Sequence, residues 1–180
     1  MHSLRALLAS LLLIVGFGLV APAPAAAAPY CGITWGSLAK ASTPYTGAPV
    51  VNVRAGRHAC FDRLVIDVRG KSAGYNVRYT SPVTGASGIA TPLRGGADIQ
   101  VTVNAPAHDS RYNATYRPAV RSEAVNVAGF PTFRQVAYVS SYEGTTTFGL
   151  GVRARLPFRV FSLNGPGTSS RIVIDVAHRW

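Results

Sequence analysis

Two copies of a short motif carry the side chains with the clearest chemistry in this chain of 180 residues. The first copy runs from Arg63 to Val68 and the second, 108 residues later, from Arg171 to Val176. Both read arginine, a branched aliphatic residue, then Val-Ile-Asp-Val. A guanidinium group binds carboxylates and phosphates through paired hydrogen bonds, and a carboxylate binds cations and hydroxyl groups. The four charged side chains are therefore candidates for binding a polar ligand.

Each copy has the composition of a β-strand. It is rich in β-branched residues and holds neither Gly nor Pro, which favours a strand over a helix. Successive side chains of a strand point to opposite faces, so each copy has a charged face and an apolar face. The apolar face supplies six predicted core residues: Leu64, Ile66, Val68, Ile172, Ile174 and Val176.

The charged face leaves two interpretations open. Positions four apart in a strand are separated by about 13 Å, so Arg63 cannot bond to Asp67, nor Arg171 to Asp175. Each must find a partner on a neighbouring strand or in a ligand. The face is either a set of structural ion pairs between strands or a surface for a polar polymer.

The pattern of a catalytic centre is missing from the sequence. It holds no nucleophile elbow, phosphate-binding loop or zinc-protease motif. His58 with Asp62, or His108 with Asp109, could act as a base with its orienting group, but no nucleophile is signalled beside either pair. We expect a protein that is not an enzyme and that needs no metal and no cofactor.

Residues 1–27 resemble a secretory signal peptide. A basic start with Arg5 precedes an apolar run from Ala6 to Val20, followed by small residues suited to cleavage. No later stretch is long and apolar enough for a membrane helix. We expect a secreted, cell-wall-associated protein without a transmembrane anchor, made of a lead-in segment at 28–48 and one domain at 49–180.

Two further features fit an exported protein. Cys31 and Cys60 are the only cysteines, and oxidising conditions outside the cell predict that they form a disulfide. Without residues 1–27 the chain has 17 basic and 7 acidic residues, a net charge of +10. Such a field attracts polyanions, which outside a cell are wall polymers rather than nucleic acid.

Alternation of apolar and polar residues predicts an all-β fold. Short strands separated by turn residues, with little or no helix apart from the signal peptide, indicate an antiparallel two-sheet β-sandwich. One such strand has Ile99, Val101 and Val103 on one face and a wet opposite face. Residues 105–118 are expected to form a long surface loop. The strands are expected near residues 50–54, 59–69, 75–79, 98–104, 124–127, 133–140, 148–153, 158–163 and 169–176.

Motifs spread over Val51 to His178 resemble the AMIN-like domain family of secreted bacterial proteins, which is similar to the AMIN domain of cell-division amidases. The segments that carry the resemblance are Gly56-x-His58-x-Cys60 leading into the first repeat, Tyr75-x-Val77-x-Tyr79, Gly95-Gly96-Ala97, Tyr142-Glu143-Gly144, Phe148-Gly149-x-Gly151, Pro157-Phe158-Arg159-Val160 and the second repeat.

The resemblance implies a non-catalytic module that binds peptidoglycan or associated anionic wall polymers. Its ligand surface would include Arg63, Asp67, Arg171 and Asp175, because AMIN domains display Arg-and-Asp strand motifs on outer faces. The alternative is an envelope scaffold that binds another protein through the Tyr- and Arg-containing loop at 105–118.

Overall fold

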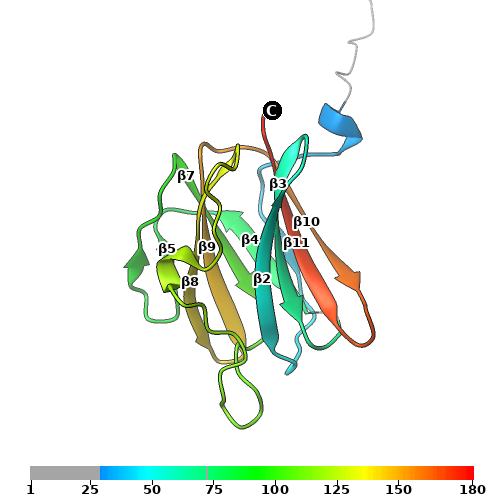
Figure 1. Cartoon of the computed structure of the whole chain (residues 1–180), viewed down its shortest axis with the longest axis vertical. Coiled ribbons are helices and arrows are strands. Elements are labelled where there is room, and N and C mark those ends of the chain that lie inside the picture. Colours follow the sequence, from blue (N-terminus) through cyan, green and yellow to red (C-terminus); the bar gives the residue numbers. More distant parts are fainter. Residues whose placement is uncertain (1–28, 72) are drawn as a thin grey trace, which may run out of the picture.

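The computed structural model of the chain describes residues 29–71 and 73–180. Residues 1–27, predicted as a signal peptide, lie outside this range. The described chain forms two antiparallel sheets packed face to face, which confirms the predicted all-β sandwich (Figure 1). Its elements in order are η1 (Tyr30–Gly32), β1 (Lys40–Ser42), β2 (Val50–Arg57), β3 (Phe61–Val68), β4 (Tyr75–Tyr79), β5 (Val83–Thr84), β6 (Ala90–Thr91), β7 (Ala97–Val103), η2 (Arg121–Glu123), β8 (Phe133–Tyr142), β9 (Thr145–Val152), β10 (Phe158–Asn164) and β11 (Ser170–Ala177).

The larger sheet has the order β1-β4-β7-β9-β8 and the smaller one β10-β11-β3-β2. The two repeats are β3 and β11, which lie side by side at the centre of the smaller sheet. The predicted lead-in segment supplies η1 and β1, and β1 pairs with β4 at the edge of the larger sheet. This segment therefore packs as part of the sandwich.

The core lies between the two sheets. All six apolar residues predicted from the repeats are at most 1% exposed. They face the inward side chains of the larger sheet, among them Ile99, Val101 and Phe148. The period-two alternation predicts these residues correctly, because one face of each central strand is buried against the other sheet.

The outer face of the larger sheet is drier than its sequence suggests. Gln100 is only 8% exposed, and its side-chain carbonyl accepts a hydrogen bond from the amide of Thr84 in β5. The chain before β7 also crosses this face. A Cβ on Gly151 would stand 2.1 Å from the carbonyl oxygen of Arg94. The small residues of β9 thus leave room for a second backbone, whereas the prediction of a wet face is wrong at Gln100.

Residues 124–127 do not form the strand that the sequence predicts. Ala124 donates one backbone hydrogen bond to Val136 of β8, and the Gln135 side chain donates to the carbonyl of Ser122. One backbone bond and one side-chain bond thus join this segment to β8, where a further edge strand would form a ladder. The loop at 105–118 is confirmed as lacking strands, and its tip projects at the bottom of Figure 1.

The predicted disulfide is present. Cys31 in η1 is joined to Cys60, the residue before β3, with the two Cα atoms 6.4 Å apart. It fastens the N-terminal segment to the strand that carries the first repeat.

Candidate binding face of the four-stranded sheet

The register of β3 and β11 sets the geometry of the charged face. The strands run antiparallel, with Arg63 opposite Asp175 and Arg171 opposite Asp67. Directly opposed residues of an antiparallel pair lie within side-chain reach. Each arginine of one repeat therefore stands opposite the aspartate of the other.

At the end of the strand pair where Arg63 faces Asp175, hydrogen bonds join the charged side chains. Arg63 binds Asp175 through two of them, Nε to Oδ1 at 2.7 Å and Nη2 to Oδ2 at 2.9 Å. Arg159 of β10 donates from Nε to the same carboxylate at 2.8 Å. Asp175 is fully buried beneath these groups, and its hydrogen bond raises the pKa of Arg63, partly opposed by burial.

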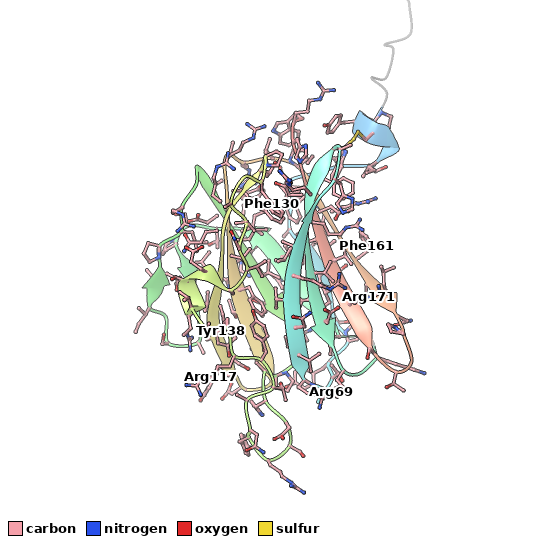
Figure 2. The ribbon with its side chains drawn as sticks, viewed as in Figure 1. Arg69, Arg117, Phe130, Tyr138, Phe161 and Arg171 are labelled. Carbon is pink, nitrogen blue, oxygen red and sulfur yellow. A yellow bond between two sulfur atoms is a disulfide. The ribbon has the colours of Figure 1, made fainter. Side chains whose placement is uncertain are left out.

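Three aromatic rings surround the two arginines. The guanidinium carbon of Arg63 lies 5.1 Å from the ring centre of Phe61, and that of Arg159 lies 5.1 Å from Phe161 and 5.7 Å from Trp35. These distances fit cation–π contacts. We call Arg63, Arg159, Phe61, Phe161 and Trp35 the arginine–aromatic cluster. Figure 2 labels Phe161 beside Arg171 on the smaller sheet.

Trp35 supplies an aromatic ring from the segment before β1. It is half-buried and packs on the outside of the sheet, with its ring centre 6.0 Å from that of Phe61. Its Nε1 donates to the carbonyl of Tyr30 in η1. The disulfide and this hydrogen bond together hold the indole beside the arginines.

The other end of the repeat pair is arranged differently. Asp67 accepts two hydrogen bonds from Arg54 of β2, at 3.0 and 3.1 Å, and one from Asn52 at 3.1 Å. Arg171 has no ion pair within the described chain and donates one long hydrogen bond, 3.5 Å, to the carbonyl of Asn164. The structure therefore brings Arg63 and Asp175 into contact but leaves Asp67 and Arg171 as unbonded neighbours.

Of the two interpretations of the charged face, structural ion pairs are confirmed for Asp175 and Asp67. Ligand binding by the four predicted residues stays a prediction. Sequence reasoning missed the partners Arg159, Arg54 and Asn52. The signal for Arg159 was the turn sequence around Gly167, since a hairpin centred on that residue places residue 159 opposite residue 175.

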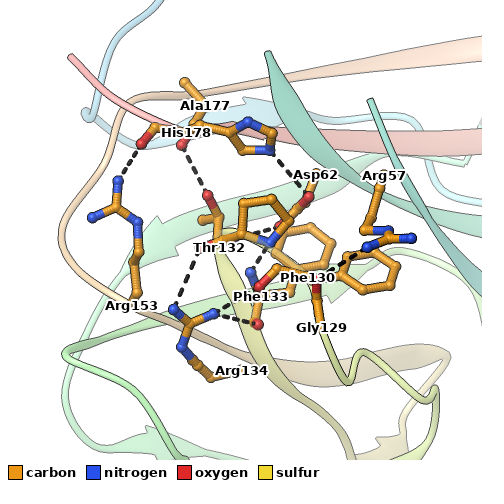
Figure 3. Close-up of polar contacts among 11 residues, drawn as sticks. Arg57, Asp62, Gly129, Phe130, Thr132, Phe133, Arg134, Arg153, Ala177 and His178 are labelled. Carbon is orange, nitrogen blue, oxygen red and sulfur yellow. Dashed lines mark hydrogen bonds and ion pairs between the residues drawn. The ribbon is translucent and has the colours of Figure 1, made fainter. Parts of the chain in front are cut away.

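The histidines considered as catalytic bases have other contacts. His58 stacks on Phe61, with 4.6 Å between ring centres, while Asp62 lies 3.1 Å from Nε2 of His178. Figure 3 shows this contact beside Thr132 and Phe133, whose amides donate to the same carboxylate. His108 Nδ1 lies 2.9 Å from the backbone carbonyl of Asp109. Over residues 29–71 and 73–180, His, Cys, Asp and Glu side chains form no group of three suited to a metal.

The sequence model of the AMIN-like domain family matches residues 48–178, which contain both repeats. The chain belongs to the AMIN-like domain family. The match begins after β1 and ends before the C-terminal Arg179 and Trp180, so Trp35 lies outside it. Curated proteins gave no match to this chain. Within the described residues, no helix is long and apolar enough to span a membrane.

Proposed function

We propose that this AMIN-like domain is a non-catalytic module of the cell envelope that binds peptidoglycan or its associated anionic polymers. The observation that carries the proposal is the arginine–aromatic cluster on the outer face of the smaller sheet. Its guanidinium groups stand partly exposed between aromatic rings, with 25% of the Arg63 side chain and 31% of the Arg159 side chain accessible. A polymer with acidic groups and with sugar rings, whose apolar C–H faces can pack on aromatic rings, offers partners for both kinds of side chain.

The arrangement of Asp175 supports a surface that is prepared in advance. The buried carboxylate fixes two arginines that would otherwise move freely, so less side-chain entropy is lost when a ligand binds. Asp175 is fully buried, and in this proposal it acts by positioning Arg63 and Arg159. Asp67 also holds an arginine, Arg54, but the Asp67 side chain is 21% exposed and that of Arg54 is 51% exposed.

The overall charge of the chain supports an acidic ligand. A net charge of +10 beyond residues 1–27 attracts polyanions over distances of about one Debye length, roughly 8–10 Å at physiological salt. This attraction raises the association rate for any polyanion. Specificity then depends on the geometry of the face rather than on charge alone.

Co-sedimentation with insoluble sacculi tests the proposal. The protein should pellet with sacculi, and Arg159→Gln should weaken the binding while Arg63 still pairs with Asp175. Arg117→Gln is the matched control, because it removes one exposed charge from the loop at 105–118. Equal binding by both variants, or failure of the wild-type protein to pellet, would refute the proposal. Sacculi stripped of anionic polymers distinguish the glycan from its acidic partners.

A second candidate is a protein scaffold, favoured by the loop at 105–118. Tyr112 at its tip is 83% exposed and stacks on His108 with 5.0 Å between ring centres. Exposed tyrosines are enriched at protein interfaces. Retention of an envelope protein by the wild-type chain, and its loss with Tyr112→Ala, would support this function instead.

A further inference from the structure

The two ends of the repeat pair differ although their sequences match. At one end, Arg63 uses two donors on Asp175. At the other, Asp67 is already held by Arg54 and Asn52, so Arg171 lacks the carboxylate that the register places opposite it. The second arginine of the repeat is thus left without the partner that the first one has.

The donors of Arg171 are largely unused within the described chain. Its one hydrogen bond, to the carbonyl of Asn164, is at the long limit of 3.5 Å. Its Nε is buried and has no hydrogen-bond partner among the described residues. An unmet buried donor on a charged group is unfavourable, so an acceptor that reaches this guanidinium would be stabilised there.

A small cavity adjoins this arginine. It has a volume of about 220 Å³ and is lined by Arg54, Asp67, Ser170 and Arg171 on the strands and by Pro166 and Ser169 at the turn before β11. Sites for drug-sized ligands measure about 300–1,000 Å³. This cavity is therefore the size of one acidic group with its adjoining atoms, smaller than a saccharide chain.

We propose that this cavity binds a single carboxylate, with the guanidinium of Arg171 as its main donor. Two arginines and one aspartate give the cavity a net charge of +1, which attracts an anion. The planar fork of a guanidinium matches the two oxygens of a carboxylate. The inference rests on the proposed function, because it names the acidic group of the wall polymer that the face would recognise.

The test is an NMR titration that follows the Nε–H signal of Arg171. The probes are N-acetyl-alanine, its carboxamide, and glycerophosphoglycerol, which carries a monoanionic phosphodiester. The acid should shift the signal in a saturable way and the carboxamide should not. Arg171→Gln should weaken binding of the acid by about tenfold or more. Arg171→Lys should recover only part of this, and Arg117→Gln should change binding by less than about twofold.

Several results would overturn the proposal: no saturable shift at Arg171, equal binding of the acid and the carboxamide, or tighter binding of the phosphodiester. If Arg171→Gln fails to fold, the wild-type titration still decides. The two proposals fail separately. If the protein binds sacculi but N-acetyl-alanine does not shift the Arg171 signal, the carboxylate site is refuted and the proposed function stands. If N-acetyl-alanine binds but the protein does not pellet with sacculi, the proposed function is refuted.

Discussion

Replacing Asp62 should destabilise the sandwich more than its position at a strand end suggests. Its carboxylate is fully buried and accepts hydrogen bonds from the amides of Thr132, at 2.6 Å, and Phe133, at 2.9 Å, where β8 begins (Figure 3). His178 contacts the other oxygen at 3.1 Å. Asp62 thus links the smaller sheet to the larger one, and Asp62→Ala would leave two buried amides without an acceptor.

The expected loss follows from these contacts. Each unsatisfied buried amide costs about 1–3 kcal/mol, so Asp62→Ala should lower the free energy of unfolding by about 2–6 kcal/mol. For a domain of this size, each kcal/mol lowers the melting temperature by about 2–4 °C. We expect a decrease of roughly 10 °C. Asp62→Asn keeps one carbonyl oxygen for the amides and should lose about half as much.

Urea unfolding and calorimetry at neutral pH measure these changes. Asp109→Ala is the matched control, because Asp109 also accepts backbone amides, from Arg111 and Asn113, but in an exposed loop. The control should lose much less stability. If Asp62→Ala unfolds at the same urea concentration as Asp109→Ala, the carboxylate does not tie the sheets together and the reasoning is refuted.

Three further changes test other parts of the structure. Asp175→Asn should lower the free energy of unfolding by about 2–4 kcal/mol, because it removes the charge that two arginines share; urea unfolding unchanged from wild type would contradict this. Gly151→Ala should cost about 1–3 kcal/mol, since its Cβ would stand 2.1 Å from the Arg94 carbonyl oxygen; a wild-type melting temperature would show that this segment moves freely. Burial raises the pKa of Tyr79 to about 12 from 10.0, so its contribution to stability is complete below pH 10 and is lost as the pH rises through about 12. In a pH titration followed by phenolate absorbance, Tyr79→Phe should lack one tyrosine that ionises at unusually high pH. If the variant instead lacks a tyrosine with an ordinary pKa, the raised pKa of Tyr79 is refuted.

Local patterns were enough to predict the sandwich and its core. The repeats alternate with a period of two, which identifies Leu64 and Ile174 as inward-facing without any knowledge of their neighbours. The pairing of Cys31 with Cys60 followed from their being the only two cysteines. The prediction failed at residues 124–127, where the apolar pattern is short and the chain meets β8 through isolated hydrogen bonds rather than a ladder.

The partners of the charged groups needed information that alternation does not hold. Arg159 meets Asp175 across a hairpin, so strand register was required as well as strand position. The partners of Asp62 are more distant, 70 residues away at Thr132 and 116 at His178. Such contacts depend on how the two sheets are packed, which no local spacing specifies. Arg171 is left without an ion pair among the described residues because Asp67 binds Arg54 instead, and the sequence does not indicate which of these two arginines Asp67 would bind.

The two ends of the described chain lie at one pole of the sandwich (Figure 1). Arg179 stands 4.6 Å from the ring centre of Tyr30, and Trp180 shares a cavity wall with Trp35. Arg171 lies near the start of β11, which ends at this pole, so its cavity is about 20 Å away along the strand. A tag or solid support attached at the C-terminus would therefore leave the Arg171 cavity accessible. It would sterically block the indole of Trp35 before any other part of the face. Immobilised-protein assays and solution assays should then agree for small acids and differ for long polymers.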